Sequence, residues 1–267
     1  MLELLLIILA LYLFAIRCRS GHPGLKELEG WKYAHRGLHG GGVPENSMAA
    51  FKAALDHGYG IELDVHLLKD GNLAVMHDSL LNRTTGHPGR IEDLTPGDLI
   101  NYPLEGTEET IPEFMDVLTL YNGKAPLIIE LKPTDGNHAA LAEAACHMMD
   151  TYQGPFCMES FDPRCVAWLR KNRPGVIRGQ LTENFFRSRN CDLPDWLKFA
   201  LKHCLSNFLT VPDFVAYKFA DRNSPVSVKL CKKLWKAKTV TWTLKTMEEF
   251  NTAVAEGWIP IFEDFTP

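Results

Sequence analysis

Two histidines and three carboxylates lie in four short polar motifs, and each motif occurs at the end of an apolar run. The motifs are His35-Arg36-Gly37, Glu62-Leu63-Asp64, His77-Asp78 and Glu130-Leu131-Lys132. Imidazole can accept or donate a proton near neutral pH, and carboxylate oxygens are the ligands that hard divalent cations prefer. These residue types therefore indicate acid–base chemistry assisted by a cation.

The three carboxylates are candidate metal ligands. Residues i and i+2 of a strand face the same side, so Glu62 and Asp64 project together, as do Glu130 and Lys132. Adjacent unpaired carboxylates repel each other, and a bound cation removes that conflict. An all-oxygen set suits one Mg²⁺ or Ca²⁺ ion better than zinc. The alternative is a layer of salt bridges, for instance from Glu130 to Lys132 or from Glu62 to Arg36.

His35 and His77 are the candidate proton carriers. Cleavage of a phosphodiester requires one proton to leave the attacking oxygen and another to reach the departing oxygen. Arg36 follows His35 and can bind phosphate in a bidentate way, while Gly37 would let the backbone approach a ligand. The plainer alternative for each histidine is a hydrogen-bonded structural residue.

The elements that must position these motifs alternate between short apolar runs and helical stretches, which is typical of a parallel α/β fold. Residues 65 and 73 are too close for a parallel crossover, so the run at 73–76 must return as a hairpin arm. The remaining eight strands predict a (β/α)₈ TIM barrel. The nine predicted strands are residues 31–35, 60–65, 73–76, 127–131, 156–160, 176–181, 214–217, 239–244 and 259–263.

Capping residues predict where several helices begin. Ser47, Asp162 and Thr246 each precede a helical stretch and can accept hydrogen bonds from its first turn. Residues 82–109 are polar and rich in turn residues, and they follow His77-Asp78 directly. This segment is expected to be either an insertion over the cleft or an ordinary surface excursion.

Length and composition favour one catalytic domain. The chain has 267 residues, of which 46% are hydrophobic and 23% are charged, and no Pro/Gly/Ser-rich linker divides it. A net charge of −5 argues against a nucleic-acid partner. Seven scattered cysteines without a C-x-x-C spacing suggest free thiols in a reducing compartment. No protein partner is predicted.

The first residues form a different region. Residues 4–16 are continuously apolar, and with the first three residues they would form a helix about 24 Å long, somewhat less than the roughly 30 Å bilayer core. Arg17 and Arg19 follow this run rather than precede it, which favours a retained anchor over a cleaved signal. We therefore expect a single-pass transmembrane helix with the catalytic domain on the cytoplasmic side. The expected regions are an anchor at 1–19, a juxtamembrane segment at 20–30 and the catalytic barrel at 31–267.

From about residue 31 to the C-terminus, the chain resembles the glycerophosphodiester phosphodiesterase family. The resemblance rests on eight motifs in the family's order and spacing: Ala34-His35-Arg36-Gly37, Pro44-Glu45-Asn46-Ser47, Glu62-Leu63-Asp64-Val65, Lys69-Asp70-Gly71, His77-Asp78, Glu130-Leu131-Lys132, Ser160-Phe161-Asp162 and Trp242-Thr243. The last strand departs from the family, which usually has Thr-Asp where this chain has Glu263-Asp264. That departure bears on the substrate alcohol or the rim of the cleft.

The resemblance implies metal-dependent hydrolysis of glycerophosphodiesters to glycerol 3-phosphate and an alcohol. It implies that His35 and His77 are the acid–base pair and that Glu62, Asp64 and Glu130 are the metal ligands. Arg36 and Lys132 resemble the cations that bind phosphate, and Glu45 and Asn46 resemble a motif that shapes the site. Phe161 and Trp242 resemble apolar walls of the cleft. The main alternative is a lysophospholipase D of the same barrel type; a catalytically silent binding module is a further one.

Overall fold

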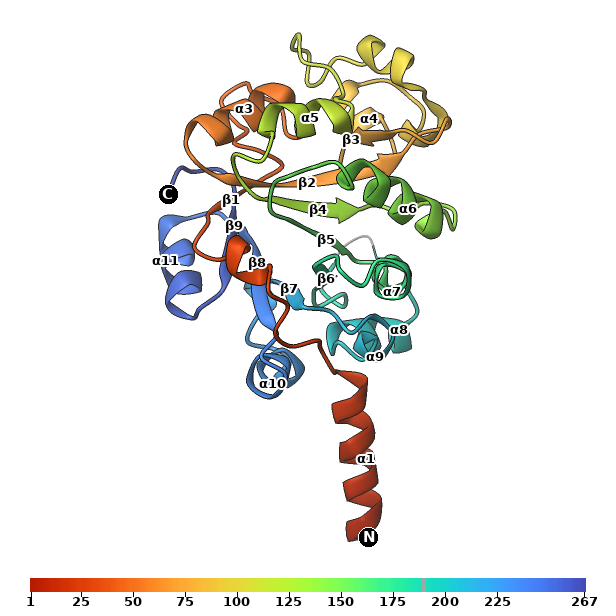
Figure 1. Cartoon of the computed structure of the whole chain (residues 1–267), viewed down its shortest axis with the longest axis vertical. Coiled ribbons are helices and arrows are strands. Elements are labelled where there is room, and N and C mark those ends of the chain that lie inside the picture. Colours follow the sequence, from red (N-terminus) through yellow and green to blue (C-terminus); the bar gives the residue numbers. More distant parts are fainter. Residues whose placement is uncertain (189–190) are drawn as a thin grey trace.

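A closed barrel of eight parallel strands forms the body of the computed structural model, which describes residues 1–188 and 191–267 (Figure 1). Each barrel strand pairs in parallel with its neighbours, and β1 pairs with both β2 and β9, which closes the sheet. The predicted (β/α)₈ architecture is confirmed. The barrel strands are β1 (Tyr33–His35), β2 (Gly60–Leu67), β4 (Leu127–Leu131), β5 (Phe156–Ser160), β6 (Arg178–Thr182), β7 (Phe214–Lys218), β8 (Lys238–Leu244) and β9 (Ile259–Phe262).

The one predicted strand that lies outside the barrel is the hairpin arm at residues 73–76. β3 (Leu73–Val75) runs antiparallel to β2, with Val65 opposite Val75 and Leu67 opposite Leu73. A tight turn at Gly71, whose φ is +91°, connects the two strands. The hairpin prediction is therefore confirmed, and β3 delivers His77 back toward the barrel mouth.

Helices surround the barrel, and the predicted capping residues begin three of them (Figure 1). The side chains of Ser47, Asp162 and Thr246 accept hydrogen bonds from backbone N–H groups in the first turns of α3, α7 and α11. The longer helices are α3 (Met48–Asp56), α5 (Phe114–Tyr121), α6 (His138–Met149), α7 (Pro163–Asn172), α8 (Asp195–Lys202), α10 (Val226–Leu234) and α11 (Met247–Ala255); α9 (Asn207–Thr210) and the 3₁₀ turn η3 (Phe219–Asp221) are short.

The alternation of side chains along the strands separates the core from the site. In β2, Ile61, Leu63 and Val65 point outward into the main core under the helices. The intervening Glu62 and Asp64 therefore point into the barrel. The lower half of the interior is apolar and contains, among others, Ile128, Cys157, Phe214, Val240 and Ile261. The polar side chains of the four motifs thus lie toward the end of the barrel where the strands finish.

The segment after the hairpin is ordered. It contains α4 (Asn82–Thr85) and the 3₁₀ turns η1 (Ile91–Asp93) and η2 (Pro96–Asn101), and it lies beside β3 in Figure 1. Leu81, Ile91 and Leu99 form a small core of their own with Ala74 and Met76. Glu92 also accepts hydrogen bonds from His66 of β2 and from Thr134, if His66 carries its proton on Nδ1. The expected insertion is therefore a packed extension of the hairpin.

The segment that precedes β1 closes the opposite end of the barrel. The short helix α2 (Leu25–Leu28) buries Leu25 and Leu28 in the apolar interior, and Tyr33 donates a hydrogen bond to the Leu28 carbonyl. Arg19 holds this segment in place because its guanidinium contacts the buried carboxylate of Asp213. Together with the apolar interior, Leu25 and Leu28 separate the polar site from the opposite end of the barrel.

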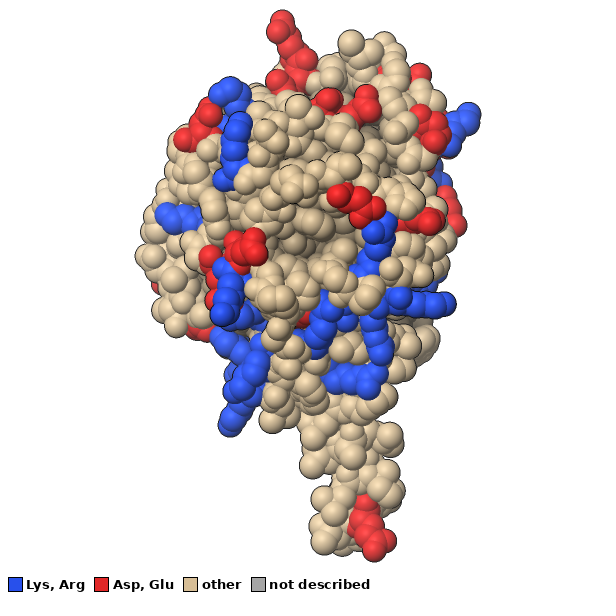
Figure 2. Space-filling view, viewed as in Figure 1, with Lys and Arg blue, Asp and Glu red and all other residues tan. Residues whose placement is uncertain are grey.

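The expected transmembrane span is not supported. Helix α1 (Leu2–Ala15) has 14 residues, which corresponds to about 21 Å, and none of its residues is buried. Over the described residues, no helix combines the length and the apolar character that crossing a bilayer requires. The predicted orientation of the domain stays a prediction. In Figure 2, basic side chains gather over the lower part of the barrel, next to the base of α1.

Candidate active site

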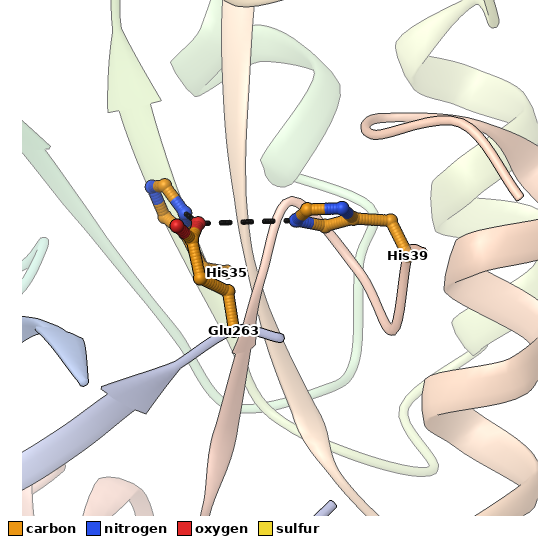
Figure 3. A group of neighbouring side chains, drawn as sticks. All are labelled: His35, His39 and Glu263. Carbon is orange, nitrogen blue, oxygen red and sulfur yellow. Dashed lines mark hydrogen bonds and ion pairs between the residues drawn. The ribbon is translucent and has the colours of Figure 1, made fainter. Parts of the chain in front are cut away.

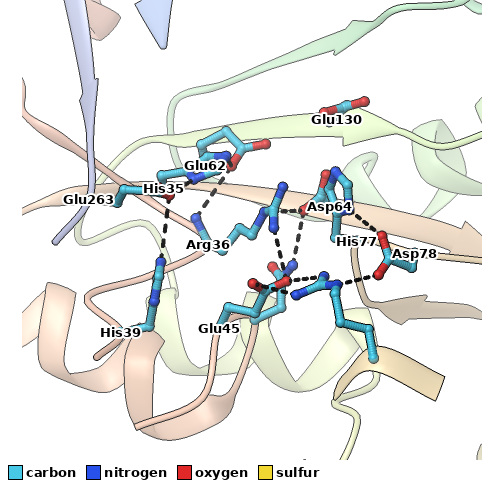
Figure 4. A network of polar contacts seen from close by, with 12 residues as sticks. His35, Arg36, His39, Glu45, Glu62, Asp64, His77, Asp78, Glu130 and Glu263 are labelled. Carbon is cyan, nitrogen blue, oxygen red and sulfur yellow. Dashed lines mark hydrogen bonds and ion pairs between the residues drawn. The ribbon is translucent and has the colours of Figure 1, made fainter. Parts of the chain in front are cut away.

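The four polar motifs converge on the carboxyl ends of the strands, where TIM barrels hold their active sites. His35 ends β1 directly opposite Glu62 on β2, and Asp64 lies opposite Glu130 on β4. The hairpin returns His77 to the same rim, and Figure 4 shows both imidazoles around the carboxylates. Residues separated by up to 95 positions in the chain thus share one site because the strand register aligns them.

The three predicted metal ligands form a buried acidic cluster. Glu62, Asp64 and Glu130 each offer a carboxylate oxygen, and these oxygens lie within 4.8 Å of one another. Burial and the neighbouring charges of Asp64 and Glu130 raise the pKa of Glu62 well above its usual range. Burial also raises the pKa of Glu130, and Lys132 offsets this effect only in part. The donor set fits a hard divalent cation, which would relieve this repulsion.

Asp64 is the centre of the polar network. Its carboxylate accepts a hydrogen bond from Asn46 Nδ2 at 2.9 Å and lies 3.3 Å from Arg36 Nε and 3.4 Å from Lys132 Nζ. Burial opposes its charge, but Lys132 and Arg36 prevail and hold the pKa of Asp64 well below its usual value. Lys132 also contacts Glu130 at 2.9 Å. The salt-bridge layer expected as an alternative is therefore present around Asp64 and Glu130.

Glu62 differs from the other two ligands. The backbone N–H of Arg36 donates to its carboxylate at 3.3 Å, and His35 Nε2 lies 3.8 Å away. Within residues 1–188 and 191–267, no lysine or arginine nitrogen forms an ion pair with Glu62, so the predicted Glu62–Arg36 bridge is not formed between side chains. Two cations thus face three buried carboxylates, and in the described part of the chain neither cation forms an ion pair with Glu62.

Glu45 orients two arginines at the rim. It accepts a hydrogen bond from Arg36 Nη1 at 2.9 Å and two more from Arg83 of α4. Arg36 and Asn46 both have left-handed backbone conformations, with φ of 54° and 53°, and the Asn46 N–H donates to the Arg36 carbonyl. This strained pair of turns supports the prediction that Glu45 and Asn46 shape the site.

Gly37 is required where the loop after β1 passes close to α3. Its φ is +81°, and a Cβ atom built there would lie 2.8 Å from the backbone of Ala50 in α3. The glycine therefore allows the loop after β1 to pack against this helix. This close approach to α3 anchors the Arg36 turn, and the approach of a ligand to the same backbone stays a prediction.

His35 is held by a carboxylate from the last strand. Figure 3 shows Glu263, next to the end of β9, between His35 and His39. His35 Nδ1 forms a very short contact with Glu263 Oε2, and His39 Nε2 lies 3.8 Å from the same oxygen. Burial lowers the pKa of His35 below its usual value, although Glu263 opposes this effect. A neutral imidazole that donates Nδ1–H to Glu263 leaves Nε2 free toward Glu62; this tautomer is assigned from the contacts.

The sequence did not predict that Glu263 contacts His35. The signal was the replacement of the family's usual Thr-Asp by Glu263-Asp264, but the pairing of β1 with β9 was needed to interpret it. His35, His39 and Glu263 also have the residue types of a metal site. However, Lys245 Nζ lies 2.5 Å from the other oxygen of Glu263 and supplies positive charge there already. The cluster therefore serves to orient His35.

His77 has a carboxylate partner of its own. Its Nδ1 lies 2.6 Å from Oδ1 of Asp78, whose other oxygen accepts a hydrogen bond from Arg83. Hydrogen bonds from His77 and Arg83 hold the pKa of Asp78 well below its usual range. Each imidazole is thus fixed at Nδ1 by a carboxylate, which leaves Nε2 for chemistry.

Two neighbouring hollows are lined by these side chains. An inner cavity of about 130 Å³ lies in the barrel mouth and is lined by His35, Glu62, His77, Glu130, Glu159 and Trp242, among others. An outer cleft of about 590 Å³ borders His77, Arg83, Lys132, Phe161 and Asp162. His77, Glu130 and Phe161 belong to both. The rings of Phe161 and Trp242 pack edge to face, with 5.5 Å between their centroids. Both of these predicted wall residues line the inner cavity.

Comparison with known proteins identifies the family. The family model described as glycerophosphoryl diester phosphodiesterase matches residues 35–266. "Glycerophosphodiester phosphodiesterase 1" of Bos taurus is 46% identical over 277 residues, which cover 88% of this chain and 79% of that protein. "Glycerophosphodiester phosphodiesterase" of Bacillus altitudinis is 37% identical over 161 residues; the match spans 56% of this chain and 65% of that relative.

Solved structures agree with the architecture. A phosphodiesterase of Oleispira antarctica, determined in complex with the product sn-glycerol-3-phosphate, superposes with a TM-score of 0.70 at 22% identity; the match covers 88% of this chain and 92% of that one. At this identity the likeness bears on the fold alone. The family model, however, spans nearly the whole barrel and includes every predicted site residue. The chain therefore belongs to the glycerophosphoryl diester phosphodiesterase family of enzymes.

Proposed function

We propose that this chain hydrolyses glycerophosphodiesters to glycerol 3-phosphate and an alcohol. Family membership supports the reaction class. The observation that carries the proposal is the convergence of two imidazoles with Glu62 and Glu130 on one cavity at the barrel mouth, where Asp64 completes the buried acidic cluster. A negatively charged ester in that cavity would meet every group that its cleavage requires.

One divalent cation, Mg²⁺ or Ca²⁺, completes the proposed site. Glu62, Asp64 and Glu130 would hold it, because their oxygens are close together and their repulsion lacks a full counter-charge. When bound, the cation would neutralise charge on the phosphate and favour attack at phosphorus. Arg36 and Lys132 would add positive charge at the same rim, and their contacts with Asp64 hold both side chains in place.

The two imidazoles would divide the proton transfers. His35 lines only the inner cavity, whereas His77 also borders the outer cleft. We therefore place the glycerol part of the substrate near His35 and the alcohol part in the outer cleft. His35 would take the proton of the nucleophile, either water or the adjacent glycerol hydroxyl, as its oxygen bonds to phosphorus. The bond from phosphorus to the alcohol oxygen would break, and His77 would protonate that oxygen. If the glycerol hydroxyl is the nucleophile, this step would give a cyclic phosphate. A water molecule would then add to phosphorus, with loss of its proton to one imidazole, while the bond from phosphorus to that hydroxyl oxygen breaks and the oxygen is reprotonated, which gives glycerol 3-phosphate.

Substitution of the histidines tests this proposal. His35→Ala and His77→Ala should each lower the turnover of glycerophosphocholine at least 100-fold, while the folded structure is retained. Release of choline and of glycerol 3-phosphate should be measured in the presence of Mg²⁺ or Ca²⁺ and again after EDTA treatment. His57→Ala is the matched control, because His57 is exposed and follows the end of α3. Full activity in either active-site variant, or hydrolysis insensitive to EDTA, would refute the assignment.

A lysophospholipase D activity is a second candidate, because an apolar groove adjoins the site. The groove, of about 410 Å³, is lined by Phe161, Pro163, Phe185, Leu193, Leu197 and Leu201. Phe161 connects it to both the inner cavity and the outer cleft. An acyl chain attached to the glycerol could lie against these side chains and remove their apolar surface from water.

The acyl-chain hypothesis has its own assay. Choline release from lysophosphatidylcholine should be compared with choline release from glycerophosphocholine. Leu197→Asp should lower the ratio of these two rates about tenfold, because it puts a charge in the groove. An unchanged ratio would remove the groove from the substrate site and leave the deacylated diester as the substrate.

A further inference from the structure

A buried carboxyl group that the proposed chemistry does not use lies in the wall of the inner cavity. Glu159 on β5 has no exposed surface, and it lines the inner cavity together with His35, Glu62 and Glu130. Both of its carboxyl oxygens are without a hydrogen-bond partner in the part of the chain that the structure describes. A buried polar group in this state is costly unless something else satisfies it.

Glu159 lies beside the acidic cluster but is not a member of it. Its backbone is aligned with that of Glu130 on the neighbouring strand β4. The group of oxygens within 4.8 Å of one another comprises Glu62, Asp64 and Glu130, without Glu159. Glu159 therefore extends the polar wall beyond the proposed cation site, toward the part of the inner cavity that contains Leu181, Trp242 and Ile261.

Trp242 offers a complementary group on the same wall. Its indole N–H is buried and, over residues 1–188 and 191–267, makes no hydrogen bond. Its ring lines the inner cavity and packs edge to face on Phe161. The wall of the cavity thus contains a carboxyl group and an indole N–H that lack hydrogen-bond partners among the described residues, with apolar side chains nearby. A short carbon chain that carries hydroxyl groups has the complementary chemistry.

We propose that Glu159, together with the indole N–H of Trp242, binds the hydroxyl groups of the substrate's glycerol and so determines specificity for a glycerol-bearing diester. This inference rests on the proposed function, because it concerns the substrate of that same site. A carboxyl group accepts a hydrogen bond from a hydroxyl whether it is ionised or protonated. The volume of about 130 Å³ suits a small polyol, while Leu181 and Ile261 would contact its carbon atoms.

A role as an additional cation ligand is the competing explanation. It would require Glu159 to approach the other carboxylates, from whose close-set group it is absent. The two explanations differ in what they predict for ligands that lack hydroxyl groups.

The experiment compares two ligands that differ only in the hydroxyl groups. Binding of sn-glycerol 3-phosphate and of n-propyl phosphate to the cation-loaded full chain should be measured by calorimetry. In Glu159→Met, a change that keeps the side-chain size, affinity for glycerol 3-phosphate relative to propyl phosphate should fall about three- to tenfold. Glu159→Gln keeps an acceptor and should retain most of the preference. Trp242→Phe keeps a ring without the N–H and should lose part of it.

Each outcome decides the inference. An unchanged preference in Glu159→Met and Trp242→Phe would overturn it. Equal weakening of both ligands, accompanied by weaker binding of Mg²⁺ or Ca²⁺, would identify Glu159 as a cation ligand and overturn it as well. If Glu159→Met does not fold, the preference of Trp242→Phe decides. Failure of the proposed function is distinguishable, because the unmodified chain would then neither hydrolyse glycerophosphocholine nor bind glycerol 3-phosphate.

Discussion

The Nδ1 atom of His77 lies 2.6 Å from Oδ1 of Asp78, the residue that follows it in the chain. The other oxygen of Asp78 accepts a hydrogen bond from Arg83 Nε, and the remaining nitrogens of Arg83 donate to Glu45. Glu45 in turn accepts from Arg36. A continuous ionic chain therefore joins the imidazole delivered by the hairpin to the arginine after β1, and α4 supplies its central member.

Arg83 should therefore act by positioning His77. We expect Arg83→Ala to lower kcat about tenfold with little change in KM, because Asp78 loses the donor that orients it. Arg83→Lys should recover part of the loss. The free energy of unfolding should change by less than about 1 kcal/mol, since the side chain is 47% exposed. Arg173→Ala, which removes an ion pair with Asp150, is the matched control.

Glu62→Gln should abolish turnover without lowering the stability of the cation-free protein. Burial and the charges of Asp64 and Glu130 raise the pKa of Glu62, so its ionised form is disfavoured in the folded chain. Without a divalent cation, the variant should be at least as stable as the unmodified protein. Added Mg²⁺ or Ca²⁺ should raise the melting temperature of the unmodified protein and much less that of the variant.

Thermal unfolding with and without the cation measures this difference, and turnover of the variant should be lost. Glu108→Gln, at an exposed position, controls for the change in net charge. Equal stabilisation of both proteins by the cation would show that Glu62 is not a ligand.

Glu263 should make stability depend on pH in the acid range. Burial opposes its charge, but the hydrogen bond with His35 and the nearby His39 and Lys245 side chains hold the pKa of Glu263 well below its ordinary value. A carboxylate with a lowered pKa in the folded state contributes stability above its unfolded pKa, near 4.3, and loses it as the pH falls. Glu263→Gln should therefore cost about 1.5–3 kcal/mol at pH 7.

The difference in free energy of unfolding between the unmodified protein and Glu263→Gln should be constant down to about pH 5. At lower pH this difference should narrow progressively. Urea unfolding at a series of pH values, without divalent cation, measures it. A difference that grows on acidification would contradict the assignment of the carboxylate form.

Gly179 should be required for packing between β6 and β7. It lies opposite Phe214 in the register, and a Cβ atom there would approach the Phe214 ring to 2.1 Å. Because Phe214 is itself buried in the barrel interior, Gly179→Ala should cost about 1–3 kcal/mol. Gly97→Ala, where a Cβ atom would meet nothing within 4 Å, should be nearly neutral. Comparison of the two melting temperatures checks this prediction.

Much of the barrel and of the site could be predicted because strand periodicity is local. The alternation in Glu62-Leu63-Asp64 requires both carboxylates to share a face, whatever lies around them. The capping roles of Ser47, Asp162 and Thr246 depend only on the first turn that follows each residue. The predicted transmembrane span of α1 is not supported. The helix ends at Ala15 after 14 residues, whereas crossing a bilayer requires about 20.

The sequence by itself determined which side chains point into the barrel and which polar motifs end its strands, because both follow from covalent geometry over a few residues. Only the tertiary structure decided that Glu263 would hold His35, that Arg83 would support His77 and that Glu159 would have no hydrogen-bond partner among the described residues. These relationships depend on the closure of β1 against β9, on the docking of the insertion and on the register of β4 with β5. Contacts between residues far apart in the chain arise from packing the whole domain, and no local pattern encodes them.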